Sequence, residues 1–278
     1  MNYGLNLSKE REEQSEQDWV FGATGLKCLA EIPEEEREGF LPKGELQNIG
    51  EEKMDCASRA PLNILETKFN WLIKNKKLSF ANEVWLKEKG YIVNDKIEFS
   101  DAFVAINSGT TREGNSLRSP LDAIRKQGLI PKSVLPQAQT WEEHHDPNRI
   151  TGVIRLLGEE FAQRFFINYE KVYEKDYGEL LKKDMIIVAG YAWPNPVNAE
   201  YPKTDNNPNH AFVAYKRPRY FIFDNYQEVA GDFIKKLAEN FDLLDYGYRI
   251  LVNREMVTPQ KRSWLGRAVS YWWGTIWA

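Results

Sequence analysis

The sequence lacks the features that mark secreted, membrane-spanning and nucleic-acid-binding proteins. Only two of its 278 residues are cysteines, Cys28 and Cys56. They provide no disulfide framework beyond one bridge between themselves, so a reducing compartment or the interior of a virion suits the chain. The 37 basic and 41 acidic residues nearly balance, which predicts no attraction to nucleic acid.

Hydrophobic runs are also short, because no apolar stretch reaches the length of a transmembrane helix. The opening residues, MNYGLNLSKE, have neither the basic nor the apolar region of a secretory signal. We therefore expect a protein that is cytoplasmic or associated with a virion.

The composition is that of a globular protein. With 42% hydrophobic and 13% aromatic residues, the chain has ample material for one main core. We expect an N-terminal arm at 1–40, the main domain at 41–255 and an aromatic C-terminal tail at 256–278.

Helices are predicted mainly in the first half of the main domain and strands in the second. Apolar residues recur with helical spacing over 57–74, where Pro61 falls early enough to be tolerated. Further helices are expected at 80–89, 119–127 and 150–182, an irregular insertion at 137–148, and strands at 91–93, 97–99, 185–191, 211–215 and 220–223. This order, without regular alternation of strands and helices, predicts an α+β fold.

Cys56 stands at the head of the best-supported helix, and His210 opens a predicted strand roughly 150 residues later. Only a thiolate is a strong nucleophile, and a free thiol is mostly protonated at neutral pH. A helix N-terminus and a nearby imidazolium both favour the thiolate. The pair therefore predicts nucleophilic catalysis by an activated cysteine.

A third polar residue is needed to orient the imidazole. Asp224 and Asn225 end the strand that follows His210, and residues that face each other across a hairpin share a face of the sheet. A two-residue turn at Arg217-Pro218 would place His210 opposite Asn225, and a loop shifted by one residue would place it opposite Asp224. The residues alone leave both open.

An acyl-transfer site also needs donors for the developing oxyanion, normally the backbone N–H of the nucleophile and one side-chain amide. Gln47 is the candidate amide, although an exposed loop glutamine would fit the sequence equally well. The run His144-His145-Asp146 could suggest a metal site. Adjacent histidines do not share a helix face, and no Cys or third His stands nearby at ligand spacing, so we interpret the run as a solvated turn. His145 is also a weaker candidate base than His210, because it is not accompanied by a strand with a following Asp or Asn partner.

Together these pieces resemble the papain-like (C1-type) cysteine peptidase superfamily, in particular its divergent phage and bacterial forms. The resemblance covers roughly residues 40–230. It rests on QNIG before the nucleophile, Cys56 with its helix, the glycine-punctuated loop and the helix that ends in KQGLIP, the NHA motif at His210, and FDNY at Asp224. Alignment of DNY with the family's Asn-Ser-Trp favours Asp224 over Asn225.

The resemblance implies a helical half, whose central helix carries Cys56, packed on an antiparallel sheet half that carries the histidine. It implies Cys56 as nucleophile, His210 as general base and acid, Asp224 in place of the family's usual Asn, Gln47 as oxyanion donor and Asn209 as a substrate-binding residue. The implied substrate is a polypeptide, and the implied chemistry requires no metal or organic cofactor.

Two other functions stay open. A peptidoglycan-cleaving Cys-His amidase or endopeptidase would share the chemistry, although its His usually lies much closer to the Cys. A catalytically vestigial protein could instead serve as a structural or virion component. The segment Lys261–Trp277 is aromatic and locally basic, which favours docking onto a partner protein or the chain's own body over contact with a membrane interface.

Overall fold

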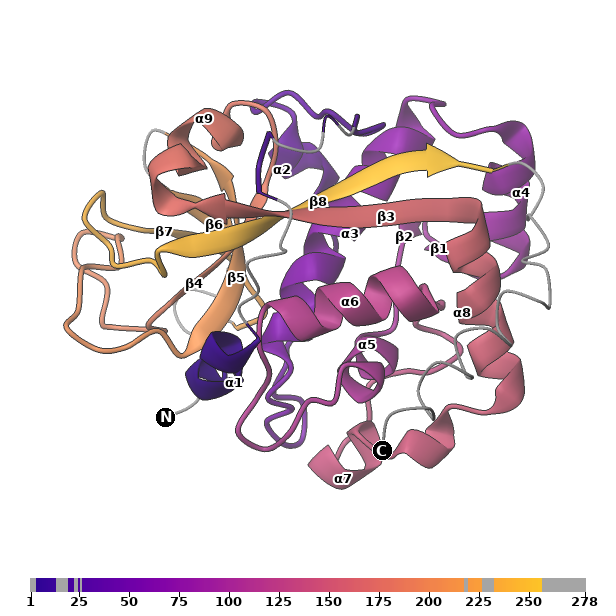
Figure 1. Ribbon diagram of the computed structural model, residues 1–278, viewed down its shortest axis with the longest axis horizontal. Coiled ribbons are helices and arrows are strands. Elements are labelled where there is room, and N and C mark those ends of the chain that lie inside the picture. The colour runs from indigo at the N-terminus through magenta and orange to yellow at the C-terminus, as the bar shows by residue number, and fades with distance from the viewer. Residues whose placement is uncertain are drawn as a thin grey trace, which may run out of the picture.

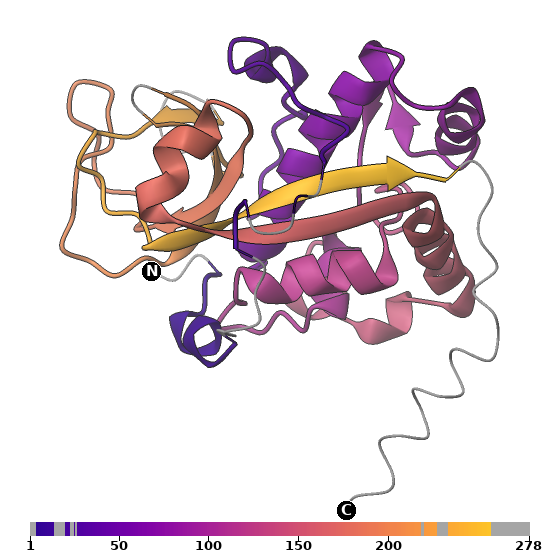
Figure 2. The same cartoon turned by 45° about the horizontal axis from the view of Figure 1, so that its top comes forward.

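The computed structural model describes residues 4–13, 20–22, 25, 27–217, 220–226 and 233–256. Both views show a helical side and a sheet side, with two long strands that run from one to the other (Figures 1 and 2). The segment Lys261–Trp277 and its predicted docking lie outside the described residues. Within those residues, no helix has both the length and the apolar character needed to cross a membrane.

The helices and strands follow the predicted order of helices first and strands second. The helices are α1 (Leu7–Glu12), α2 (Arg37–Phe40), α3 (Cys56–Lys74), α4 (Phe80–Glu88), α5 (Asp101–Asn107), α6 (Arg118–Gln127), α7 (Trp141–His144), α8 (Gly152–Arg164) and α9 (Tyr177–Leu181), with short 3-10 helices at Pro147–Arg149 and Glu174–Asp176. The strands are β1 (Ile92–Val93), β2 (Lys96–Ile97), β3 (Phe165–Tyr173), β4 (Ile186–Gly190), β5 (His210–Lys216), β6 (Phe221–Phe223), β7 (Ile234–Lys236) and β8 (Tyr246–Glu255).

The main sheet is antiparallel, with the strand order β3-β8-β4-β5-β6-β7. Its central strand β4 is buried at every residue, as a strand covered on both faces should be. The other two strands, β1 and β2, form a separate hairpin among the helices. The α+β prediction is therefore confirmed.

Helix α3 lies at the centre of the molecule and packs against β4, β5 and β8 (Figure 1). It is buried along almost its whole length, so packing rather than helix propensity stabilises it. Pro61 lies inside the helix, so the N–H that would donate to the Ala57 carbonyl is missing there, and the burial of α3 outweighs that loss. The helix predicted at 57–74 is confirmed, and it begins at Cys56.

The helical side has an aromatic core around Phe69 of α3. The ring of Phe69 lies 5.0 Å from that of Phe165 and 5.8 Å from that of Phe161, between centroids. Such tilted and edge-on pairs add about 0.5–1.5 kcal/mol each beyond the burial of their area. Because Phe161 lies in the last turn of α8 and Phe165 begins β3, this cluster joins both elements to the central helix.

The prediction of one helical segment over 150–182 is wrong. Helix α8 ends at Arg164, and the chain passes directly into β3, which pairs with β8. Glu170 and Lys171 are buried within β3, and such charges among apolar residues imitate the pattern of an amphipathic helix. Pairing with a strand some 80 residues away overrides that local pattern. The short helix α5 and the strands β7 and β8 were not predicted either.

The N-terminal region packs against the main domain through a few buried anchors. Leu5, Glu10 and Arg37 are at most 3% exposed. Glu10 accepts a hydrogen bond from the Tyr246 hydroxyl at 2.7 Å, and Arg37 donates to the Tyr215 carbonyl at 3.0 Å. These contacts join α1 and α2 to strands of the main sheet.

Candidate active site

Cys56 occupies the first position of the 19-residue helix α3. The positive end of the helix dipole, with its unpaired N–H groups, therefore lies at the thiol. Cys56 is only 1% exposed, and its Sγ accepts a hydrogen bond from the Ala211 N–H at 3.4 Å. This contact places Cys56 at the start of β5, beside His210.

His210 is the first residue of β5 and is fully buried. Its Nε2 lies 2.6 Å from Oδ1 of Asp224. The other ring nitrogen, Nδ1, is thereby left for the thiol, and a hydrogen bond with the Cys56 side chain contributes to the electrostatics of the ring. The three side chains thus form a continuous chain from thiol to imidazole to carboxylate.

The charges of these three side chains stabilise one another. Burial alone would lower the pKa of His210, but the negative charges of Asp224 and then of Cys56 outweigh it and raise that pKa to about 10. Burial would likewise raise the pKa of Asp224, but His210 and then Lys235 lower it to about 2. At neutral pH the arrangement favours an imidazolium held against the Asp224 carboxylate.

The hairpin register explains why Asp224, and not Asn225, reaches the imidazole. Val213 pairs with Phe223, and the same register continued beyond the strand end sets His210 opposite Tyr226. Asp224 is then a diagonal neighbour on the same face, and Asn225 points to the other face. Neither register considered from the sequence is the observed one, because a bulge between Ala214 and Lys216 changes the pairing at the turn.

Asn225 holds the neighbouring segments instead. Its Oδ1 accepts a hydrogen bond from Asn63 of α3 at 2.9 Å, and its Nδ2 donates to the Glu45 carbonyl at 3.1 Å. Its own carbonyl accepts from the Gln47 N–H at 3.0 Å. The residue therefore fixes the loop that carries Asp224 onto the helix that carries Cys56.

Trp193 and Lys235 complete the surroundings of Asp224, and neither was identified from the sequence. The Trp193 indole N–H and the Lys235 ammonium both donate to Oδ2 of Asp224 at 2.9 Å. The indole ring also lies edge-on to the His210 ring at 5.7 Å. A high tryptophan content gives no hint of which ring lies at the site, and a lysine in a short strand gives no hint that it is buried.

Gln47 is fully buried, so the exposed-loop interpretation is wrong. Its Nε2 donates to Oε1 of Glu52, and the other oxygen of Glu52 accepts from the Tyr226 hydroxyl. The Tyr226 ring lies 5.2 Å from the His210 ring. Gln47 is thus connected to the site through Glu52 and Tyr226, while the amide nitrogen carries a second hydrogen that could point toward a bound carbonyl.

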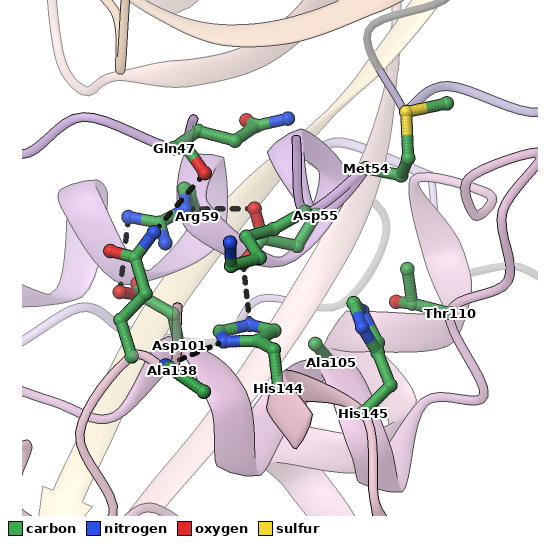
Figure 3. A network of polar contacts seen from close by, with 12 residues as sticks. Gln47, Met54, Asp55, Arg59, Asp101, Ala105, Thr110, Ala138, His144 and His145 are labelled. Carbon is green, nitrogen blue, oxygen red and sulfur yellow. Dashed lines mark hydrogen bonds and ion pairs between the residues drawn. The ribbon is translucent and has the colours of Figure 1, made fainter. Parts of the chain in front are cut away.

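The interpretation of residues 144–146 as a solvated turn is wrong for His144, which is fully buried. Its Nε2 lies 3.1 Å from Oδ2 of Asp55, the residue that precedes the nucleophile. Asp55 also pairs with Arg59, and Arg59 pairs with Asp101 (Figure 3). This polar network anchors the start of α3 to the 137–148 insertion, which the sequence analysis left irregular.

No dashed contact joins His145 to Asp55 in the same view (Figure 3). Its ring stacks on that of Trp141 at 4.3 Å, and burial lowers its pKa to about 4. It therefore lies outside the Cys56–His210–Asp224 chain. Within the described residues, no three His, Cys, Asp or Glu side chains gather in a way that could hold a metal ion.

The N-terminal segment 4–6 lies beside the site. The Leu5 N–H donates to the carbonyl of Asn209, which precedes His210, at 3.3 Å. Two further backbone bonds of 2.9 Å join the segment to Asn115, and Gly4 packs directly on the backbone of Met54. The segment therefore contacts the neighbours of both Cys56 and His210.

Asn209 itself contributes its side chain to the scaffold, since its Oδ1 accepts from the Ala192 N–H at 2.9 Å. Cys28 lies elsewhere, with Sγ 3.4 Å from the Lys68 ammonium. Both cysteines are free thiols, so the bridge that two cysteines allow is not formed.

No family model matches the chain, and no curated protein matches it by sequence. Its structure is similar to xylellain, a cysteine protease from Xylella fastidiosa, with a TM-score of 0.55 and 15% identity over 91% of this chain and 96% of that one. Digestive procathepsin L 3 of Tenebrio molitor larval midgut gives a TM-score of 0.53 and 11% identity over 90% of this chain and 76% of that one. The Carica candamarcensis cysteine protease CMS1MS2, solved in complex with E-64, gives a TM-score of 0.51 and 10% identity over 81% of this chain and 99% of that one.

At such identities the similarity shows the fold alone. The chain has the fold of papain-like cysteine proteases, as its motifs led us to expect.

Proposed function

We propose that the chain is a papain-like cysteine peptidase that cleaves polypeptides with Cys56 as nucleophile, His210 as general base and acid, and Asp224 as the residue that orients the imidazole. The observation that supports this most is the chain of contacts in which Nε2 of His210 lies 2.6 Å from Asp224 while Cys56 Sγ contacts the N–H that follows His210. That arrangement leaves the second ring nitrogen for the thiol, as nucleophile activation requires.

In the proposed reaction the Cys56 thiolate attacks the carbonyl carbon of the scissile peptide, and the carbonyl electrons move to the oxygen. The backbone N–H of Cys56 and the Nε2 of Gln47 stabilise this oxyanion. As the tetrahedral intermediate collapses, the C–N bond breaks and His210 gives its proton to the leaving amine. His210 then takes a proton from water, the hydroxide attacks the thioester, and the acid leaves with the thiolate restored.

Asp224 keeps its charge throughout. Its role is to hold the Nε2–H tautomer of the neutral imidazole and to stabilise the imidazolium. The donors from Trp193 and Lys235 fix the carboxylate, so the ring is held in one orientation.

Covalent labelling tests this proposal. The purified protein is incubated with a biotinylated epoxide or vinyl-sulfone probe, with E-64 as competitor because that compound is bound in the Carica protease structure. We expect labelling that is lost in Cys56→Ala and falls at least about a hundredfold in His210→Ala. The matched control is Cys28→Ala, which removes the other free thiol and should label like the wild type.

Hydrolysis of a quenched fluorescent peptide library should follow the same pattern. Labelling at Cys28, or labelling that persists without His210, would refute the assignment. A protein that labels at Cys56 but cleaves only peptidoglycan would shift the substrate to the amidase or endopeptidase class.

A further inference from the structure

Lys235 is a buried cation placed against the candidate catalytic carboxylate. It lies in the middle of β7 and is only 5% exposed, whereas its neighbours Ile234 and Lys236 are half-buried. Its ammonium donates to Oδ2 of Asp224 at 2.9 Å and to the Tyr226 carbonyl. It also lies 5.1 Å from the centroid of the Trp193 ring. These contacts all join the Lys235 ammonium to residues of the candidate site.

A buried lysine is rare unless it has a partner, because taking an ammonium out of water is costly. Here the partner is a carboxylate whose other oxygen is occupied by His210. The charges at the site alternate as Cys56 thiolate, His210 imidazolium, Asp224 carboxylate and Lys235 ammonium. They sum to zero only when the lysine is counted. Without it, the imidazolium would stand between two anions in a buried site.

We propose that Lys235 is a positioning residue of the hydrolase site, which neutralises Asp224 and holds its carboxylate in the orientation that His210 requires. This inference rests on the proposed function. It adds a fourth charged residue to the Cys56, His210 and Asp224 set, and it assigns the strand β7 a part in the chemistry.

The effect on His210 has a definite sign. A cation near the carboxylate disfavours the imidazolium, so removal of Lys235 should raise the pKa of His210 further, while removal of the Asp224 charge should lower it. Among the described residues, the other ionisable groups in contact with the ring are Cys56 from α3 and Tyr226, whose hydroxyl is bound to Glu52. None of these is changed by substitutions at 224 or 235, so differences among the variants report on the Asp224–Lys235 pair.

The test compares Lys235→Met, Asp224→Asn and the double variant with the wild type. His210 is titrated by the NMR signals of its imidazole, which is practical because the chain has three histidines. We expect the pKa of His210 to follow the order Lys235→Met, wild type, double variant, Asp224→Asn, from high to low. The order arises because Asp224→Asn removes the anion but keeps the cation, while the double variant removes both.

Labelling of Cys56 provides the second readout. Either single variant should label at least about tenfold more slowly than the wild type, because each leaves one buried charge without its partner, and the double variant should recover at least about tenfold relative to Asp224→Asn. Lys235→Arg keeps the charge and should stay near the wild-type titration. Lys236→Met is the matched control on the same strand, since that lysine pairs with Glu200 at 2.8 Å on the other face.

Two results together would overturn the inference. The first is a double variant that labels no faster than the product of the two single-variant effects, and the second is an unchanged His210 titration in Lys235→Met. If Lys235→Met does not fold, thermal unfolding will reveal it, and the comparison of Asp224→Asn with the double variant and with Lys235→Arg still decides. Wild-type protein without Cys56-dependent labelling would defeat the proposed function instead, while the titration order would still test the charge pairing.

Discussion

Replacement of Arg59 by Met should destabilise the protein by about 3–5 kcal/mol, because it leaves buried carboxylates without their cation. Arg59 lies one turn into α3 and is 1% exposed. Its Nε lies 2.8 Å from Oδ1 of Asp55, and its Nη1 lies 3.1 Å from Oδ2 of Asp101. Asp55 is fully buried and has His144 as its other partner (Figure 3).

The chain contains a matched control for this change. Lys87 and Glu83 form an ion pair on α4 with the same spacing of four residues and the same 2.8 Å distance, but the lysine side chain is 57% exposed. Such an exposed helical pair contributes about 0.3–0.5 kcal/mol. Lys87→Met should therefore have almost no effect, and the difference between the two variants isolates the contribution of burial.

The measurement is guanidinium unfolding followed by tryptophan fluorescence, with thermal unfolding as a second assay. Arg59→Met should lower the midpoint at an unchanged denaturant dependence, and should lower Tm by about 10 °C for a chain of this size. A loss below about 1 kcal/mol, or equal losses in both variants, would refute the reasoning. Because Asp55 precedes Cys56, probe labelling of Arg59→Met should also fall.

The same network predicts a dependence on pH. Burial would raise the pKa of Asp55, but Arg59 and His144 outweigh it and hold that pKa below its usual range. A carboxyl with a lowered folded pKa stabilises the protein above its unfolded pKa, and this contribution is lost as the pH falls through the folded value. Without Arg59 the carboxyl takes up its proton at higher pH. The difference in unfolding free energy between the wild type and Arg59→Met should therefore narrow as the pH falls below about 4, the unfolded pKa of an aspartate.

Two further predictions concern the site. Burial lowers the pKa of His210, but Asp224 and then Cys56 raise it to about 10. The contribution of His210 to stability should therefore be full below its unfolded pKa and lost as the pH rises through about 10. A plot of unfolding midpoint against pH should fall in that range, and His210→Asn should remove the fall. Leu5 is 3% exposed in the segment that contacts Asn209 and Met54, the neighbours of His210 and Cys56. If this segment restricts access to Cys56, Leu5→Asp should release it and speed probe labelling of Cys56 several-fold. Equally fast labelling of the exposed control Ser8→Asp would refute that role.

The sequence was sufficient to predict the parts of the site that depend on local pattern. The helical spacing of apolar residues over 57–74 places Cys56 at a helix start, and the strand predicted at 211–215 places His210 at a strand start. A few neighbouring residues determine where a helix or a strand begins, so the positions of Cys56 and His210 at such starts could be predicted from the sequence. The joint α+β architecture followed from the same local patterns.

What the sequence could not supply depends on pairing at a distance. The family resemblance favoured Asp224 over Asn225, but the residues alone left both open. The register depends on a bulge between Ala214 and Lys216, and a shift of one residue would have turned the other side chain to His210. The long strand β3 resembles a helix until β8 is placed beside it. In both cases the deciding interaction is a ladder partner whose position the local residues do not determine.

Buried charges were the hardest features to predict, and they make up much of the candidate site. Four of these buried groups belong to residue types that are often solvated, so residue type alone favours a surface position for them. They are Lys235, Asp55, Arg59 and His144. Each is buried only because an opposite charge or hydrogen-bonding partner arrives from another segment, as Lys235 of β7 meets Asp224 after β6. Such partners compensate the desolvation of one another, so no member of the set could be assigned before all of them were placed. The candidate pair Cys56 and His210 could thus be predicted one residue at a time, whereas the charges around it become visible only as a group.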